Sequence, residues 1–183
     1  MTADRGEIWV FGYGSLMWNP GFPHVERMTA TLHGFHRSLC VYSHVHRGTP
    51  DRPGLVLGLD RGGACRGVAF RVPAAEAEGA LSYLRAREQV TSVYLETQVG
   101  LRLVDGRRVT AVTYTVDRAH QQYARRLPQP ELLRLVRQGF GVSGRNPDYI
   151  RATHAHLVEL GIKDPTLDWL MLHMPDQAGD QAV

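Results

Sequence analysis

Cysteine is scarce in this sequence, and the apolar residues never form a long run. Cys40 and Cys65 are the only cysteines among 183 residues, and they do not form a closely spaced pair. This spacing predicts neither a disulfide scaffold nor a thiolate zinc site. No stretch approaches the roughly 20 apolar residues that a membrane-spanning helix needs, and the residues after Met1 include no apolar signal core. We therefore expect a cytoplasmic protein in a reducing compartment, with no membrane partner.

A dense basic segment with interleaved aromatic residues is also absent. The formal net charge of +3 and the sequence pI of about 9.1 come mostly from arginines scattered along the chain. These include Arg37, Arg47, Arg52, Arg107, Arg108, Arg125 and Arg126. Scattered positive charge fits a small acidic ligand better than a nucleic-acid groove, so we expect no nucleic-acid partner.

The chain has no break in composition and no linker rich in proline, glycine or serine. A chain of this length can bury one hydrophobic core, so we predict a single domain over residues 1–183. Residues 1–6 and about 175–183 are expected to be flexible tails.

Apolar runs and turn signals predict many short strands, with helices placed late in the chain. The expected strands cover residues 8–11, 30–33, 38–42, 55–59, 67–72, 93–104 and 107–116, with hairpin turns at 60–63 and at Asp105-Gly106. Helices are expected over 73–88, 131–138 and 167–172, and over a segment that begins with Asn146 as a cap and Pro147 in the first turn. This order predicts an α+β domain built on a curled or barrel-like sheet.

A glycine loop follows the first expected strand, at Phe11-Gly12-Tyr13-Gly14-Ser15-Leu16. The two glycines either form a tight turn or let main-chain N–H groups approach a carboxylate, a phosphate or an oxyanion. Met17 occupies the position at which a dinucleotide fingerprint or a nucleophile elbow requires a further glycine, so neither motif is present.

Glu88 occupies a position at which the pattern of helix 73–88 calls for an apolar side chain. Ala77, Leu81 and Leu84 mark the inward stripe by steps of four and three, and the next step of four reaches Glu88. A carboxylate in such a position is usually held in an ion pair or tuned for catalysis.

Both interpretations of Glu88 have support in its neighbours. The helix dipole and desolvation near Val90 and Val93 would raise the pKa of the carboxyl, as a general base working near neutral pH requires. The structural alternative is an ion pair with Arg85 or Arg87 at the end of the helix.

The histidines form no recognised metal pattern. His44 and His46 alternate along an extended segment, and His154 and His156 are two positions apart in a helix, where they face different sides. No metal site is therefore predicted. The loop from His46 to Gly54 fits either an anionic substrate or an ordinary surface loop.

Taken together, these segments resemble the ChaC family of γ-glutamylcyclotransferases, which act on glutathione. The matching segments are Val10 to Leu16, His46-Arg47-Gly48 with Pro53-Gly54, Gly67-Val68-Ala69, Tyr83-Leu84 with Arg87-Glu88, and Ser143-Gly144-Arg145-Asn146 with Tyr149. The resemblance covers residues from about 8 to about 160.

The resemblance implies an α+β, γ-glutamylcyclotransferase-like mixed β-barrel with surrounding helices, forming a single catalytic domain. It implies that Val10, Phe11, Gly12, Tyr13, Gly14, Ser15 and Leu16 bind the γ-glutamyl group. Glu88 is then the catalytic acid/base, and Arg47 attracts the substrate carboxylates. Tyr94 is carried over to the second half of the pocket, although segment 89–94 is not the glycine-containing stretch of animal members.

The reaction that this resemblance implies uses no cofactor and no metal, and its small-molecule partner is glutathione. Two alternatives stay open: a cyclotransferase for another γ-glutamyl compound such as a γ-glutamyl amine, and a non-enzymatic regulator that binds a ligand in the same fold. If Glu88 is dispensable, Glu96 is the next acid to test. The sequence does not predict the oligomeric state.

Overall fold

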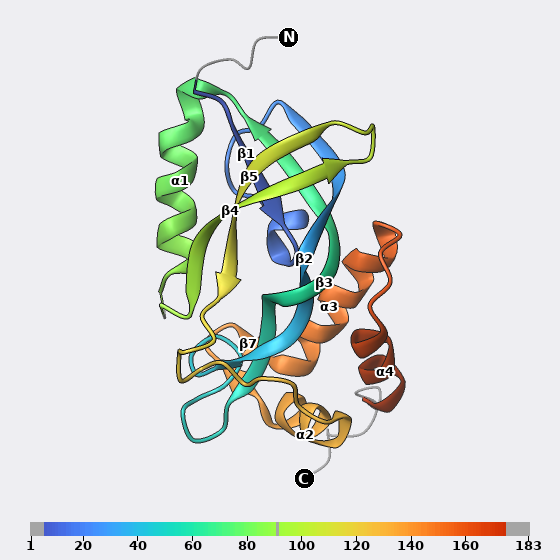
Figure 1. Cartoon of the computed structure of the whole chain (residues 1–183). Coiled ribbons are helices and arrows are strands. Elements are labelled where there is room, and N and C mark those ends of the chain that lie inside the picture. The colour runs from blue at the N-terminus through green and yellow to red at the C-terminus, as the bar shows by residue number, and fades with distance from the viewer. Residues whose placement is uncertain (1–5, 91, 175–183) are drawn as a thin grey trace. The chain divides into compact units, whose positions relative to one another are not determined.

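A closed barrel of five strands forms most of the first of two units in this computed structural model, which describes residues 6–90 and 92–174. The strands are β1 (Ile8–Gly12), β2 (Glu26–Ser43), β3 (Gly54–Val72), β4 (Tyr94–Leu103) and β5 (Arg108–Val116), and their order around the barrel is β1-β3-β2-β4-β5. Strand β1 pairs antiparallel with β3 and parallel with β5, so the barrel is mixed, as the family resemblance implies. Figure 1 shows α1 (Ala74–Glu88) along one side of this barrel.

The chain passes from one unit to the other at three places. Residues 6–38 and 57–123 form the first unit, and residues 39–56 and 124–174 form the second, so β2 and β3 contribute residues to both. The single catalytic domain over residues 1–183 stays a prediction. Most of the predicted tails, at 1–5 and 175–183, lies outside the described residues.

Alternating and continuous apolar patterns build the barrel core. In β4, Val99, Leu101 and Leu103 are buried and the residues between them are exposed, while every residue of β5 from Ala111 to Val116 is buried. Each large apolar side chain buried in this way contributes about 1.5–3 kcal/mol.

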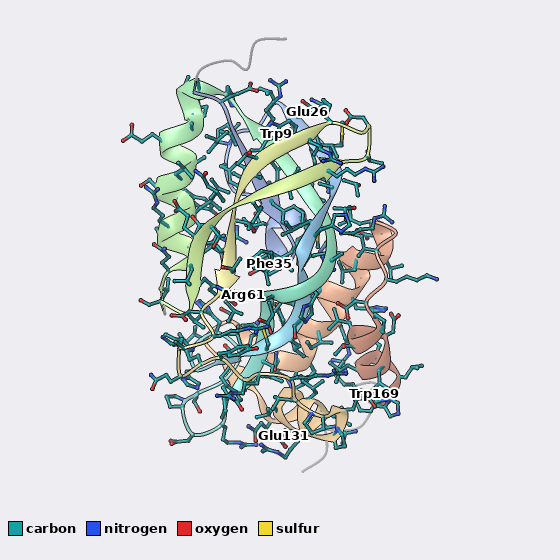
Figure 2. The ribbon with its side chains drawn as sticks, in the orientation of Figure 1. Trp9, Glu26, Phe35, Arg61, Glu131 and Trp169 are labelled. Carbon is teal, nitrogen blue, oxygen red and sulfur yellow. The ribbon has the colours of Figure 1, made fainter. Side chains whose placement is uncertain are left out.

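One end of the barrel is held by a cation between an aromatic ring and a carboxylate. The Arg107 guanidinium lies 5.6 Å from the centre of the Trp9 ring and forms an ion pair with Glu26. Figure 2 labels Trp9 and Glu26 at this end of the barrel. Part of the scattered positive charge is thus structural.

The predicted hairpin turn at residues 60–63 is wrong, because residues 54–72 form one strand, β3. Gly62 and Gly63 have φ values of +102° and +70°, and they bend the strand without reversing it. His36 Nδ1 lies 2.9 Å from the Gly62 carbonyl oxygen and ties this bend to β2. Strand β2 likewise joins the two short strands predicted at 30–33 and 38–42, with Gly34 at a φ of +89° between them.

The remaining helix and strand predictions for the first unit are confirmed. Pro73 occupies the N-cap position of α1, which ends at Glu88. Strands β4 and β5 pair antiparallel around Asp105-Gly106, where Gly106 has a φ of +94°. A 3₁₀ turn, η1 (Ser15–Met17), follows β1.

The second unit contains three helices and a short two-stranded sheet. These elements are α2 (Gln129–Gln138), β6 (Phe140–Gly141), β7 (Gly144–Arg145), α3 (Asn146–Glu159) and α4 (Pro165–His173). Helix α3 contacts both α2 and α4. The Asp164 side chain caps α4 by accepting hydrogen bonds from the N–H groups of Thr166 and Leu167.

The predicted cap of α3 is wrong, because Arg145 occupies the N-cap and Asn146 lies inside the helix. Asn146 is fully buried, and its side chain accepts a hydrogen bond from Leu55 N–H at 2.7 Å and donates one to the Leu55 carbonyl at 2.8 Å. The buried N–H and carbonyl groups of Leu55 need hydrogen-bond partners, and they therefore fix the Asn146 side chain. None of the helices in the described residues is both long enough and apolar enough to cross a membrane.

Candidate active site

The glycine loop leaves the barrel through a space in which only glycine fits. A Cβ atom on Gly67 of β3 would overlap the Gly12 carbonyl oxygen and the Phe11 ring. A Cβ atom on Gly12 would approach the Leu16 Cβ to 2.9 Å. The two glycines therefore let β1, β3 and the following turn pack together closely, as tight-turn glycines do.

The side chains of the loop are mostly buried, so a ligand can meet it mainly through the main chain and Ser15. Val10 and Phe11 are fully buried, Tyr13 and Leu16 are nearly so, and Ser15 is exposed. The use of N–H donors at this loop to bind a ligand stays a prediction.

Hydrogen bonds close the turn that follows the loop. The N–H of Met17 donates to the Gly14 carbonyl at 2.9 Å, and the N–H of Asn19 donates to the Ser15 carbonyl at 2.8 Å. The N–H groups of Gly14 and Ser15 come before these donors and are the candidates for contact with a ligand.

Arg37 supports the loop in a way that sequence reasoning missed. Its Nε donates to the Tyr13 carbonyl at 2.6 Å, and its Nη2 donates to the Arg66 carbonyl at 2.6 Å. In the sequence Arg37 is one of many scattered arginines, and no local motif sets it apart.

Glu88 lies at the end of α1, on the predicted stripe. Leu84 is fully buried and Ala77 and Leu81 are half-buried, which confirms the stripe. The Glu88 side chain is 18% exposed, and its Oε1 lies 3.6 Å from Arg87 Nε. Burial raises the pKa of the Glu88 carboxyl, and the nearby Arg87 charge opposes this rise.

Arg87 contacts Glu88 but directs its hydrogen bonds elsewhere. Its Nη2 donates to Ser15 Oγ at 2.7 Å, and its Nη1 donates to the Asn19 carbonyl at 2.7 Å and to the Tyr83 hydroxyl at 3.1 Å. The predicted ion pair at the helix end is therefore present only as a longer contact, which leaves the effect of burial on Glu88 in place.

Glu96 has the opposite environment. Arg85 donates to its two carboxylate oxygens at 2.7 and 2.8 Å, and the Tyr114 hydroxyl donates to it at 3.1 Å. The hydrogen bond from Arg85, followed by the one from Tyr114, lowers the pKa of Glu96. A carboxylate held in this way is a poor proton acceptor near neutral pH, so Glu88 is the better candidate for a general base.

The other two predicted site residues, Tyr94 and Arg47, belong to different units. Tyr94 belongs to the first unit, like the glycine loop and Glu88, and its hydroxyl donates to the Leu57 carbonyl at 2.8 Å. Arg47 belongs to the second unit. There its guanidinium lies 5.5 Å from the centre of the Tyr149 ring and donates to the Arg145 carbonyl at 3.3 Å.

The described residues contain no group of three or more histidine, cysteine or acidic side chains that could hold a metal ion. The first unit instead brings together an N–H-rich loop, an exposed serine hydroxyl and a half-buried carboxyl with a raised pKa. Such a set can bind an anionic group and exchange a proton beside it.

Comparison with solved structures identifies the fold. The chain matches a yeast γ-glutamyl cyclotransferase specific to glutathione with a TM-score of 0.81 and 23% identity, over 92% of this chain and 95% of that structure. A second structure, of a protein named γ-glutamyl cyclotransferase, matches with a TM-score of 0.56 and 15% identity, over 97% and 94% of the two chains. The protein therefore has the γ-glutamylcyclotransferase fold predicted from its motifs.

Sequence comparison narrows this class to one family. The family model described as "ChaC-like protein" matches residues 8–176, so the chain belongs to the ChaC-like family. The glutathione-specific γ-glutamylcyclotransferase of Escherichia coli is 38% identical over 92% of this chain and 73% of its own length. The mouse glutathione-specific γ-glutamylcyclotransferase 1 is 31% identical over 81% of this chain and 68% of its own length. The family resemblance seen in the sequence is confirmed.

Proposed function

We propose that this chain cleaves glutathione into 5-oxoproline and Cys-Gly as a γ-glutamylcyclotransferase of the cytoplasm. The names of its E. coli and mouse relatives support glutathione as the substrate. Within the chain, the observation that carries the proposal is the half-buried Glu88, whose pKa burial raises, in the same unit as the glycine loop.

The proposed reaction is an internal aminolysis. The α-amine of the γ-glutamyl residue attacks its own γ-carbonyl carbon, a C–N bond forms, and a five-membered lactam closes. The bond between that carbon and the cysteine nitrogen breaks, which releases Cys-Gly. Because nucleophile and electrophile belong to one molecule, the protein gains most of the proximity advantage by holding a folded-back conformer.

Glu88 moves the proton in this scheme. The attacking amine is largely protonated near neutral pH, so a base must remove its proton before attack. The departing cysteine nitrogen then needs a proton, and the protonated Glu88 carboxyl supplies it. A carboxyl whose pKa burial has raised can perform both steps better than an exposed one, since it holds a proton more readily between them.

The remaining site residues bind and orient the substrate in this proposal. The N–H groups of Gly14 and Ser15 bind the α-carboxylate or the developing oxyanion, since such donors stabilise negative charge that forms in a fixed place. Val10 to Leu16 shape the γ-glutamyl site through their backbone, and Tyr94 completes it. Arg47 attracts the carboxylates of the substrate by its charge.

Incubation of the pure protein with glutathione tests the proposal. We expect equal amounts of 5-oxoproline and Cys-Gly, detected by mass spectrometry. A well-folded protein that forms neither product from glutathione contradicts the substrate assignment. A panel with γ-glutamyl amines then compares kcat/KM values, and saturable glutathione binding without product would instead indicate a binding protein.

Two matched variants test the role of Glu88. Glu88→Gln should keep the fold and lose about 10²- to 10⁴-fold in kcat, the usual contribution of general acid–base catalysis. Glu96→Gln changes an acid of the same type eight positions later and should retain much more of kcat than Glu88→Gln does, because the hydrogen bond from Arg85 lowers the pKa of Glu96 and leaves it a poor proton acceptor. An active Glu88→Gln variant would remove Glu88 from the mechanism.

A further inference from the structure

One guanidinium joins the glycine-loop turn to the end of the helix that carries Glu88. Arg87 donates to Ser15 Oγ at the start of the turn and to the Asn19 carbonyl at its end, both at 2.7 Å. It also donates to the Tyr83 hydroxyl, one helical turn earlier in α1, at 3.1 Å. The Arg87 side chain is 21% exposed, so its hydrogen bonds are partly shielded from water.

The loop also packs against α1 at a second place. Gly21 has a φ of +75°, and a Cβ atom there would overlap the Tyr83 hydroxyl. The segment after the turn thus lies on the residue that accepts one of the Arg87 hydrogen bonds. Arg87 and Tyr83 thus both hold this segment on α1.

We propose that Arg87 is a positioning residue that locks the glycine-loop turn onto the end of α1 and fixes the direction of the Ser15 hydroxyl. The inference rests on the proposed function, because it assigns the loop to substrate binding and Glu88 to proton transfer. It adds a residue that holds these two parts in place relative to each other and acts through Ser15 and Glu88.

The direction of the Ser15 hydroxyl follows from the chemistry of arginine. A guanidinium has five donors and no acceptor, so Ser15 Oγ must accept the hydrogen bond from Arg87. The Ser15 hydrogen then points away from Arg87 and is available to a negatively charged or carbonyl oxygen. Arg87 thereby makes Ser15 a donor at the loop where the substrate is proposed to bind.

A lysine cannot replace these contacts. The three acceptors of Arg87 belong to different groups, namely a hydroxyl of the loop, a carbonyl at the end of the turn and a hydroxyl of α1. The planar fork of arginine reaches them at once, while an ammonium is a compact point charge on a flexible stem. Arg87→Lys therefore retains the charge beside Glu88 and loses the geometry.

Kinetics of Arg87→Lys and Arg87→Met with glutathione separate the contribution of the Arg87 charge from that of its hydrogen-bonding geometry. Both variants should lose about 10²-fold in kcat, the effect of a misplaced reacting group. The acid limb of kcat/KM should move to higher pH in Arg87→Met and stay near its wild-type position in Arg87→Lys, because the arginine charge opposes protonation of Glu88. Wild-type kcat in Arg87→Lys would overturn the inference.

A double-mutant cycle with Ser15→Ala provides a readout that general destabilisation does not move. If Arg87 acts partly through Ser15, the double variant Arg87→Met/Ser15→Ala should be about as slow as the slower single variant. Additive losses in kcat would contradict the coupling. Arg71→Met is the matched control, because Arg71 pairs with Glu7 and Glu26 on the barrel. It should affect stability and leave kcat unchanged.

Hydrogen–deuterium exchange tests the lock without any turnover. In Arg87→Met, the amides of Met17, Trp18 and Asn19 should exchange about tenfold faster than in the wild type, since roughly 1.4 kcal/mol of local stability corresponds to that factor. Arg71→Met should leave them unchanged. Absence of 5-oxoproline in the wild type would defeat the proposed function alone, whereas unchanged exchange in Arg87→Met would defeat this inference alone.

Discussion

Replacing Glu88 by glutamine should make the protein more stable near neutral pH while it removes the activity. The Glu88 side chain is 18% exposed, and loss of solvation raises its pKa although the Arg87 charge opposes the shift. The ionised carboxylate is therefore less stable in the folded protein than in the unfolded chain, where a glutamate has a pKa of about 4.3. Glutamine resembles the protonated carboxyl in shape and carries no charge, so the variant does not incur the free-energy cost of burying an ionised carboxylate.

The sign and size of the effect follow from the linkage between proton binding and folding. Below about pH 4 both states hold the proton, so wild type and Glu88→Gln should differ by less than about 0.5 kcal/mol. As the pH rises, the unfolded chain loses its proton first, and the wild type loses stability until the pH passes the pKa of the folded state. Above that pH the variant should be more stable by about 1.4 kcal/mol for every unit between the folded and unfolded pKa values.

Urea denaturation of the two proteins over a range from about pH 4 to about pH 9 measures this difference. The acid limb of kcat/KM for the wild type gives the pKa of Glu88 in the free enzyme independently. The two measurements should agree through the factor of about 1.4 kcal/mol per unit. A stability difference that does not change with pH, or a variant less stable than the wild type above neutrality, would refute the reasoning.

Two further predictions concern the framework of the site. Asn146→Ala should lower the free energy of unfolding by about 2–6 kcal/mol in urea titrations, because two buried main-chain groups of Leu55 lose their partners at about 1–3 kcal/mol each; a loss below about 0.5 kcal/mol would count against this account. Gly67→Ala should reduce kcat/KM for glutathione by at least about tenfold, because the added Cβ would overlap the Gly12 carbonyl and displace the loop. Gly79→Ala is its control: no atom lies near that position in α1, so stability should rise by about 0.5–1 kcal/mol with wild-type kinetics.

The parts of the fold that local patterns determine could be predicted from the sequence. The helix 73–88 follows from apolar residues that recur with a period of 3.6 residues. The hairpin at Asp105-Gly106 follows from strands with a period of two residues and from the turn dipeptide between them. All of these signals act within a few residues of the chain. The turn expected at 60–63 shows the limit of such signals. A glycine pair permits positive φ values, but whether the chain then reverses or only bends depends on the neighbouring strand, which is distant in sequence.

The candidate site likewise contains residues that local patterns reveal and residues whose roles depend on contacts distant in sequence. Glu88 was identified because its polarity conflicts with its own helix, and the glycine loop because two glycines lie close together. The support given by Arg37 and Arg87 could not be found from local patterns, since their hydrogen bonds reach residues 24 and 72 positions away. Asn146 illustrates the reverse case, since a residue that looked like a local cap serves a main-chain group 91 positions away.

Two arginines in the last turn of α1 explain why its two neighbouring glutamates differ in chemistry. Arg85 donates hydrogen bonds from Nε and Nη2 to the two carboxylate oxygens of Glu96, and this bidentate pairing lowers the pKa of Glu96. Arg87, two residues later and therefore on a different face of the helix, donates to neutral oxygens of the glycine-loop turn and of Tyr83. The two Nη groups of Arg87 donate to those oxygens while its Nε lies 3.6 Å from Glu88 Oε1, and the effect of burial on the pKa of Glu88 prevails. The contacts that hold the loop in place thus also leave the adjacent carboxyl able to exchange a proton.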